Sequence, residues 1–178
     1  MHGIIHAELK KYVETKHGPE AWRAVLDKAG LGNKIYMAIS TYEDAEAVAI
    51  VRAASALTGV PALEILEDFG LFIAPDLLGM YKSLIDPSWK TADLFVNVED
   101  TIHTVVRMKN PGATPPKLKF KRVGPNKLHF HYDSPRQMSA VAKGIMKGVA
   151  DHYNEKLEIK ERKNADGSID MQILVSPK

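Results

Sequence analysis

Hydrophobic residues recur at three- and four-residue intervals along most of the first half of the chain, which is the spacing of amphipathic helices. Glycine and proline divide this pattern into segments, because glycine often follows the end of a helix and proline fits its first turn. The pattern therefore predicts a series of helices, over residues 3–16, 19–29, 41–58, 61–69, 75–85 and 94–106.

The second half of the chain changes to a period of two, in which apolar and polar residues alternate as in half-buried strands. Residues 118–123 and 127–133 flank a Gly-Pro-Asn turn, and residues 157–162 and 169–175 flank a second turn. Residues 137–153, between the two hairpins, have helical spacing. We expect an α+β fold, with a helical N-terminal lobe and a C-terminal lobe that holds helices and a four-stranded antiparallel sheet.

The composition is that of an ordinary globular protein, with 45% hydrophobic residues, 26% charged residues and a net charge of +2. That charge is too small to indicate nucleic-acid binding. No apolar stretch approaches the roughly 18 residues of a membrane span, and no signal peptide is visible, so we expect a cytoplasmic protein. No repeat or linker divides the chain, which predicts a single domain over residues 1–178.

The chain contains no cysteine. This excludes disulfides, zinc-thiolate and iron–sulfur sites, and covalent attachment of heme through cysteines. The sequence also has no phosphate-binding glycine loop, no nucleophile elbow and no recognisable pair of catalytic carboxylates. We therefore do not expect an enzyme.

One histidine occupies a position from which it can reach a buried partner. His103 lies beside Ile102 on the border of the apolar stripe of its helix, and a neutral imidazole there can offer one nitrogen. Tyr132, Ser134 and Arg136 follow at a strand end, where two hydroxyls and a guanidinium suit carboxylates. A metal centre with acidic side arms, such as heme, fits this set. A surface histidine and a helix-capping triplet are the plainer alternatives, and both stay open.

The same residues resemble the heme nitric oxide/oxygen binding (H-NOX) family over nearly the whole chain. The resemblance rests on His103, the Tyr132-x-Ser134-x-Arg136 motif, the Gly112-Ala113-Thr114-Pro115-Pro116 loop and the opening Met1-His2-Gly3-Ile4-Ile5. It implies a bacterial gas sensor that holds heme b noncovalently between its two lobes.

The resemblance also assigns roles to these residues. It implies that His103 is the axial ligand of the iron, and that Tyr132, Ser134 and Arg136 bind the propionates. The residues that it places against the porphyrin, where they pack and distort it, are Pro116, Ile5 and Ile145.

The expected gas depends on the distal pocket. Oxygen-binding members of the family use a distal tyrosine supported by a tryptophan and an asparagine, and those places are taken here by Val141, Leu9 and Ile73. With Leu77 these form an apolar pocket, which predicts a nitric oxide sensor that also accepts carbon monoxide. The resemblance implies a separate effector protein, such as a histidine kinase or a diguanylate cyclase. The alternative that the chain is one domain of a longer receptor stays open.

Three rival functions remain open from the sequence. The first is an oxygen sensor of the same fold, for which Tyr12, Tyr81 or Tyr153 could supply a polar group. The second is a binding module for another acidic ligand, in which His103 never contacts iron. The third is an enzyme that uses His103 as a general base, which no accompanying carboxylate or nucleophile pattern supports.

Two further histidine pairs have a spacing that could chelate a metal. His129 and His131 share one face of a strand, and His2 and His6 share one face of a helix. Neither pair has an additional carboxylate or thiol in a ligand pattern, so we expect exposure to solvent instead.

Overall fold

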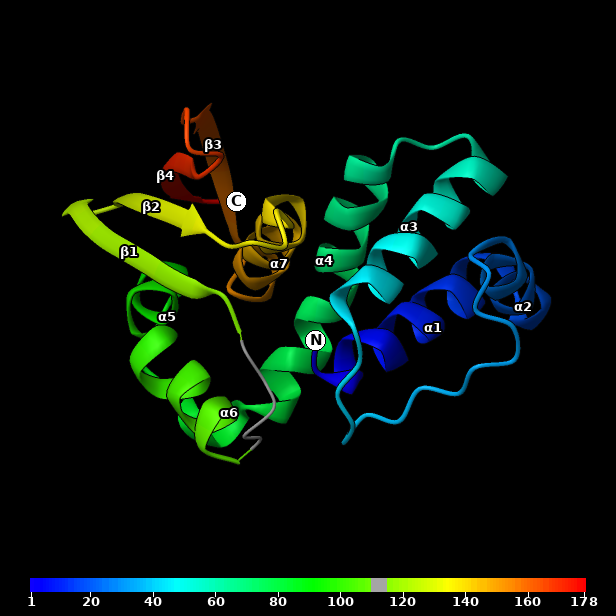
Figure 1. Ribbon diagram of the computed structural model, residues 1–178. Coiled ribbons are helices and arrows are strands. Elements are labelled where there is room, and N and C mark those ends of the chain that lie inside the picture. Colours follow the sequence, from blue (N-terminus) through cyan, green and yellow to red (C-terminus); the bar gives the residue numbers. More distant parts are fainter. Residues whose placement is uncertain (110–114) are drawn as a thin grey trace.

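The computed structural model describes residues 1–109 and 115–178, and Figure 1 shows their arrangement. The described helices come mainly from the first half of the chain, namely α1 (Gly3–His17), α2 (Pro19–Lys28), α3 (Asp44–Thr58), α4 (Ala62–Met80), α5 (Thr91–Asn97), α6 (Thr104–Lys109) and α7 (Ser139–His152), with a short 3-10 helix η1 (Lys82–Leu84) and a π-helical turn η2 (Glu99–His103).

The described strands are β1 (Lys117–Gly124), β2 (Lys127–Asp133), β3 (Glu155–Lys163) and β4 (Ile169–Pro177). They form one antiparallel sheet in the order β1-β2-β4-β3. Both predicted hairpins and the α+β fold are confirmed.

Two predicted helix boundaries are wrong. Pro75 does not open a new helix but lies inside α4, which runs without a break to Met80. Proline removes only one backbone hydrogen bond there, and the burial of α4 offsets that loss. Helix α3 begins at Asp44 rather than Thr41, because Thr41 pairs with His2 in an isolated antiparallel bridge.

The predicted helix around His103 is divided into three parts. The π turn η2 separates α5 from α6, and the His103 N–H donates to the Val98 carbonyl, five residues back, at 3.0 Å. A π turn inserts one extra residue into a helix and is common at functional sites. It shifts the side chains that follow it relative to an ideal α-helix.

Helices α4 and α7 cross at close range because glycines lie at the contact. A Cβ atom on Gly144 would clash with the Glu67 carbonyl, one on Gly70 with the Val141 carbonyl, and one on Gly148 with Ala74. These glycines therefore serve close helix packing. The crossing fixes the distance between the two lobes.

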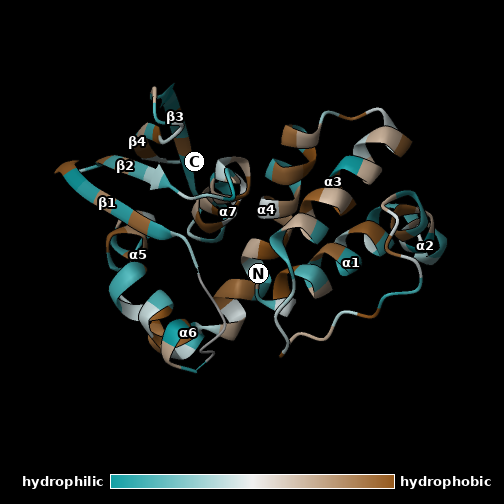
Figure 2. Ribbon diagram, viewed as in Figure 1, coloured by the Kyte–Doolittle hydropathy of each residue, from teal (hydrophilic) through white to brown (hydrophobic). Residues whose placement is uncertain are grey.

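The hydrophobic residues form two clusters. One fills the space among α1–α4, and the other lies between α5, α7 and the inner face of the sheet. Ile145 contacts both clusters. Figure 2 shows hydrophobic stretches on α1, α3 and α4, whereas β1, on the opposite side of the view, is predominantly hydrophilic. Within the described residues no single helix is long and apolar enough to cross a bilayer; only α3 and α4 together reach that length, and they are bent by 111°.

Candidate functional site

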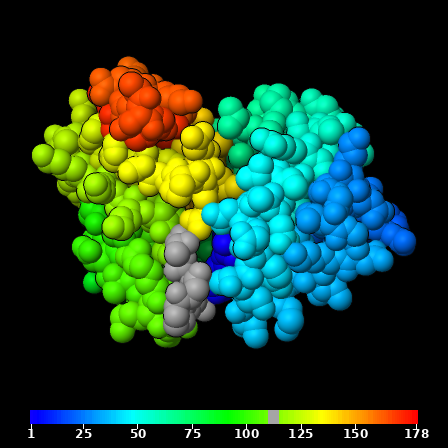
Figure 3. Space-filling model, in the orientation of Figure 1, coloured from blue at the N-terminus to red at the C-terminus, as the bar shows by residue number. Residues whose placement is uncertain are grey.

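A cavity of about 300 Å³ lies between the two clusters. Its walls are mainly apolar, with polar side chains from few positions. Figure 3 shows the N-terminal residues, in dark blue, lying between the lobes. Among the residues that line the cavity are ten of the predicted site residues, which are Ile5, Leu9, Leu77, His103, Pro116, Tyr132, Ser134, Arg136, Val141 and Ile145.

The eleventh predicted residue, Ile73, does not line the cavity. It is completely buried in the helical cluster, and its neighbour Ala74 lines the cavity instead. The error is one of register, because adjacent helix positions point about 100° apart. Ala74 is also apolar, so this part of the cavity lining is apolar as expected.

His103 is held in place by Glu99, one turn earlier on the same π turn. The His103 Nδ1 atom lies 3.0 Å from Glu99 Oε2. The same carboxylate accepts from Arg107 at 2.6 Å and from the Leu118 backbone N–H at 3.1 Å. Partial burial alone would raise the pKa of Glu99, but these hydrogen bonds keep it below its usual value.

This arrangement selects one tautomer of His103. An ionised carboxylate can only accept, so Nδ1 carries the proton and the lone pair lies on Nε2. Burial lowers the pKa of His103, although the bond to Glu99 opposes the shift and the Pro116 backbone adds to that opposition. His103 is therefore a neutral imidazole, the form that ligates metals, oriented by a carboxylate as metal-binding histidines commonly are.

Arg136 links the two lobes at the cavity. Its Nε lies 2.7 Å from Asp44 Oδ2, and its side chain is only 14% exposed. The other oxygen of Asp44 lies 2.8 Å from the N-terminal ammonium of Met1. Burial alone would raise the pKa of Asp44, but these two cations hold it below its usual value. The guanidinium is thus placed and oriented by residues from the far end of the sequence.

Tyr132 and Ser134 lie between the sheet and α7. The Ser134 hydroxyl accepts from the Arg136 N–H at 3.3 Å, whereas α7 begins after Met138 without a side-chain cap. The N-cap residue of α7 is therefore Met138 and not a member of this triplet. Burial raises the pKa of Tyr132, although hydrogen bonds from Ser134 and the Met138 backbone oppose the shift, so the phenol is neutral.

Two walls can now be distinguished. The histidine wall contains Ile102, His103, Pro116 and Leu118, and the helical wall contains Ile5, Leu9, Ala74, Leu77 and Val141. Pro115 and Pro116 both line the cavity, while the Gly112–Thr114 part of the predicted loop lies outside the described residues.

One polar residue near the helical wall is Tyr81, which lines the cavity. Burial raises its pKa, so its hydroxyl is neutral. Tyr12 instead donates to Asp68 at 2.7 Å. Tyr153 packs at the edge of the second hydrophobic cluster.

The other histidines do not form a metal site within the described ranges. His131 bonds to Asp170, and His2 accepts from the Ile4 N–H at 3.4 Å. The expected exposure of His6 is wrong, because its ring is fully buried and stacks on Tyr36 with 4.5 Å between ring centroids.

Comparison with known proteins decides the family. The model of the haem-NO-binding family matches residues 2–161, which is most of the chain. The chain belongs to this family.

The H-NOX proteins of solved structure have the same fold. An H-NOX protein from S. oneidensis in the Fe(II)NO ligation state is 22% identical, with a TM-score of 0.91 and coverage of 99% of both chains. The unliganded Fe(II) H-NOX protein from K. algicida is 26% identical, with a TM-score of 0.88 and coverage of 100% of this chain and 98% of that one.

Curated relatives include two soluble guanylate cyclases of Caenorhabditis elegans. Gcy-35 is 26% identical over 185 residues, a region that covers 92% of this chain and 25% of that protein. Gcy-31 is 22% identical over 138 residues, covering 77% of this chain and 20% of that protein. The H-NOX chain thus spans about a fifth to a quarter of the length of these relatives.

The cofactor of this H-NOX domain is heme, and the donor set in the cavity fits it. The neutral imidazole of His103 suits iron, the apolar walls suit a porphyrin, and Arg136 with the two hydroxyls suits propionates. Sequence reasoning missed Glu99 as the support of His103, although the four-residue spacing was a usable signal. It also missed Asp44, for which the sequence carries no signal.

Proposed function

We propose that this heme-binding sensor domain detects nitric oxide and discriminates against oxygen. The observation that carries the proposal is the apolar character of the helical wall, where Leu9, Leu77 and Val141 line the cavity. When bound, heme supplies a ferrous iron that takes up diatomic gases. Oxygen needs a hydrogen-bond donor for stable binding, whereas nitric oxide and carbon monoxide do not. An apolar wall therefore favours nitric oxide.

In this proposal the Nε2 atom of His103 would hold the heme iron, and release of this side chain on nitric oxide binding would be the signal. The π turn that carries His103 is the movable part, because its backbone differs from the helices on both sides. Ile5 and Pro116, from the two walls, then repack. An effector protein such as a histidine kinase or a diguanylate cyclase reads the resulting shift, and the domain acts as a sensor rather than as an enzyme.

An absorption spectrum of the reconstituted ferrous protein tests this proposal. The spectrum is recorded without gas, with nitric oxide, and in air. We expect a five-coordinate ferrous spectrum that changes with nitric oxide and is not converted to an oxygen complex in air. A stable oxygen complex would contradict the proposed discrimination, and the lack of any Soret band would contradict heme binding itself.

One observation favours an oxygen sensor as the second candidate. Tyr81 supplies a neutral hydroxyl to the cavity lining, and such a donor could stabilise bound oxygen. If the oxygen complex is stable, replacing Tyr81 with phenylalanine (Tyr81→Phe) should remove that stability while leaving nitric oxide binding intact. An unchanged oxygen complex in this variant would exclude Tyr81 as the donor.

A further inference from the structure

The sheet has a second face, turned away from the cavity. Successive residues of a strand point to opposite faces. Phe120 and Phe130 line the cavity, so their neighbours Lys119, Lys121 and His129 lie on the outer face. The register extends this outer face across all four strands.

The outer face is strongly basic. The register places three acidic residues on it, Asp133, Glu158 and Asp170. Together with seven cationic residues they give the outer face a net charge of +4. The whole chain carries +2, so the rest of the chain has a net charge of −2. The cationic residues of the outer face, all exposed, are Lys117, Lys119, Lys121, Lys127, Lys156, Lys160 and Arg162.

The six lysines of this face also differ from other lysines in their pairing. None of them has a carboxylate within 4.0 Å among residues 1–109 and 115–178. Lysines elsewhere on the surface commonly have such a partner, as shown by Lys10, Lys11, Lys16, Lys34, Lys143, Lys147 and Lys178. The charges of these six lysines are thus not paired directly with a carboxylate of the described chain.

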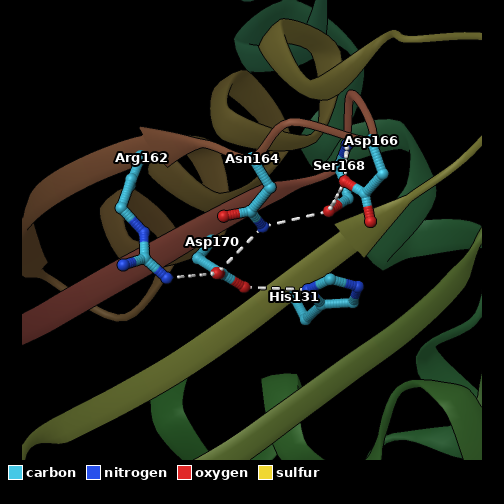
Figure 4. Close-up of polar contacts among 6 residues, drawn as sticks. All are labelled: His131, Arg162, Asn164, Asp166, Ser168 and Asp170. Carbon is cyan, nitrogen blue, oxygen red and sulfur yellow. Dashed lines mark hydrogen bonds and ion pairs between the residues drawn. The ribbon is translucent and has the colours of Figure 1, made fainter.

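The carboxylate nearest the middle of this face is already engaged. Figure 4 shows Asp170 accepting from His131 at 2.8 Å, from Asn164 at 3.0 Å and from Arg162 at 3.1 Å. The bonds from His131, Asn164 and Arg162 hold the pKa of Asp170 far below its usual value. Asp170 therefore stays ionised and orders its own neighbours, and it does not reach the lysines.

We propose that the outer face of the sheet docks an acidic protein surface. This rests on the proposed function, in which an effector reads the state of the cavity. Net positive charge gathered on one face attracts and orients a partner of opposite charge. Strands β1 and β2 carry the cavity on their inner side, so a shift of the histidine wall reaches the docked partner through the same strands. The outward residues of the described strands include no Phe, Tyr or Trp on which nucleic-acid bases could stack, which favours protein over nucleic acid.

The test uses two variants with equal changes in charge. The first reverses three charges on the outer face, by Lys119→Glu, Lys121→Glu and Lys160→Glu. The control variant carries Arg23→Glu, Arg52→Glu and Lys82→Glu, at exposed positions of α2, α3 and η1 that are not part of the sheet. The probe is fluorescent poly-L-glutamate at low salt, measured by anisotropy. We expect the outer-face variant to bind at least about tenfold more weakly than the unmodified protein, and the control to change by less than about twofold.

Two outcomes would overturn the proposal. One is an equal loss in the control, which would mean that net charge alone attracts the probe. The other is tighter binding of the unmodified protein to phosphatidylglycerol vesicles or to duplex DNA than to polyglutamate at equal charge concentration. The heme spectrum of each variant is recorded in parallel. A missing nitric oxide response there would refute the proposed function without affecting the polyglutamate result.

Discussion

The two walls of the cavity are held by different forces. The histidine wall depends on hydrogen bonds to an ionised carboxylate, in which Glu99 accepts from His103, Arg107 and the Leu118 backbone. The helical wall depends on packing, because its residues belong to helices that contact each other through glycines and aromatic rings. The first wall fixes the tautomer and direction of one side chain, and the second fixes a shape. A site that must bind a metal and admit a small apolar gas needs both.

The largest effect is expected from His103→Gly on the histidine wall. Loss of the imidazole should abolish axial ligation, so the five-coordinate ferrous spectrum should disappear completely. Added imidazole should restore it, because the space left by the side chain can admit the free base. Unaltered ligand binding in this variant would contradict the role of His103 as the iron ligand. It would support a binding module in which His103 never contacts iron.

The second-largest effect is expected at His6, whose ring stacks on Tyr36 next to the helical wall, and it depends on pH. Burial, with help from the N-terminal ammonium and Lys34, lowers the pKa of His6 to about 4, although Glu46 opposes the shift. The folded protein therefore favours neutral His6, so the stabilisation is fully present above pH ~6.5 and is lost as the pH falls towards 4.

The loss should amount to about 3 kcal/mol, as an order of magnitude, in the free energy of unfolding measured with urea. A variant with phenylalanine at this position (His6→Phe) serves as the comparison, because it keeps an aromatic ring but cannot take up a proton. Equal acid sensitivity in the two proteins would show that other groups are responsible.

The third effect tests the glycine crossing behind the helical wall. Gly144→Ala should destabilise the fold by about 2 kcal/mol, because the new methyl group would overlap the Glu67 carbonyl. Gly79→Ala is the matched control within α4, where nothing lies within 4 Å of the new atom. Its effect should be neutral or stabilising by up to about 1 kcal/mol. Similar urea midpoints for both variants would refute the close crossing.

The smallest effect sharpens the role of Glu99 on the histidine wall. Glu99→Ala removes the acceptor of His103 and should weaken heme binding by about 10- to 100-fold, measured by heme transfer to apomyoglobin. Glu99→Gln keeps an acceptor oxygen and should lose less. If both variants hold heme as tightly as the unmodified protein, then the carboxylate does not orient His103.

Short-range patterns in the sequence were sufficient for the hairpins and for most of the cavity lining. The period of two identified the strands and the period of 3.6 identified the helices. The placing of Leu9 and Val141 at the pocket came from the family resemblance and not from periodicity. The same patterns could not reveal the π turn at His103, since one inserted residue hardly changes the spacing of an amphipathic stripe. Ile73 was predicted in place of Ala74 for a different reason, because the resemblance alone fixes that position only to within one residue.

Long-range contacts were beyond sequence reasoning. Asp44 and Arg136 are far apart in the chain, and nothing in either neighbourhood indicates their ion pair. The burial of His6 depends on Tyr36 and Tyr42, which come from a loop without regular structure. Pro75 is tolerated inside α4 because α7 packs against that helix. In each case tertiary packing overrides the local preference.

The most direct test of the central claim is the electron paramagnetic resonance spectrum of the ferrous protein with nitric oxide. The hyperfine pattern reports how many nitrogen nuclei couple to the unpaired electron. If His103 lets go of the iron, only the nitrogen of nitric oxide should contribute, and His103→Gly should give the same pattern. Coupling to a second nitrogen, present in the unmodified protein and absent in His103→Gly, would show that His103 stays bound and would contradict release as the signal.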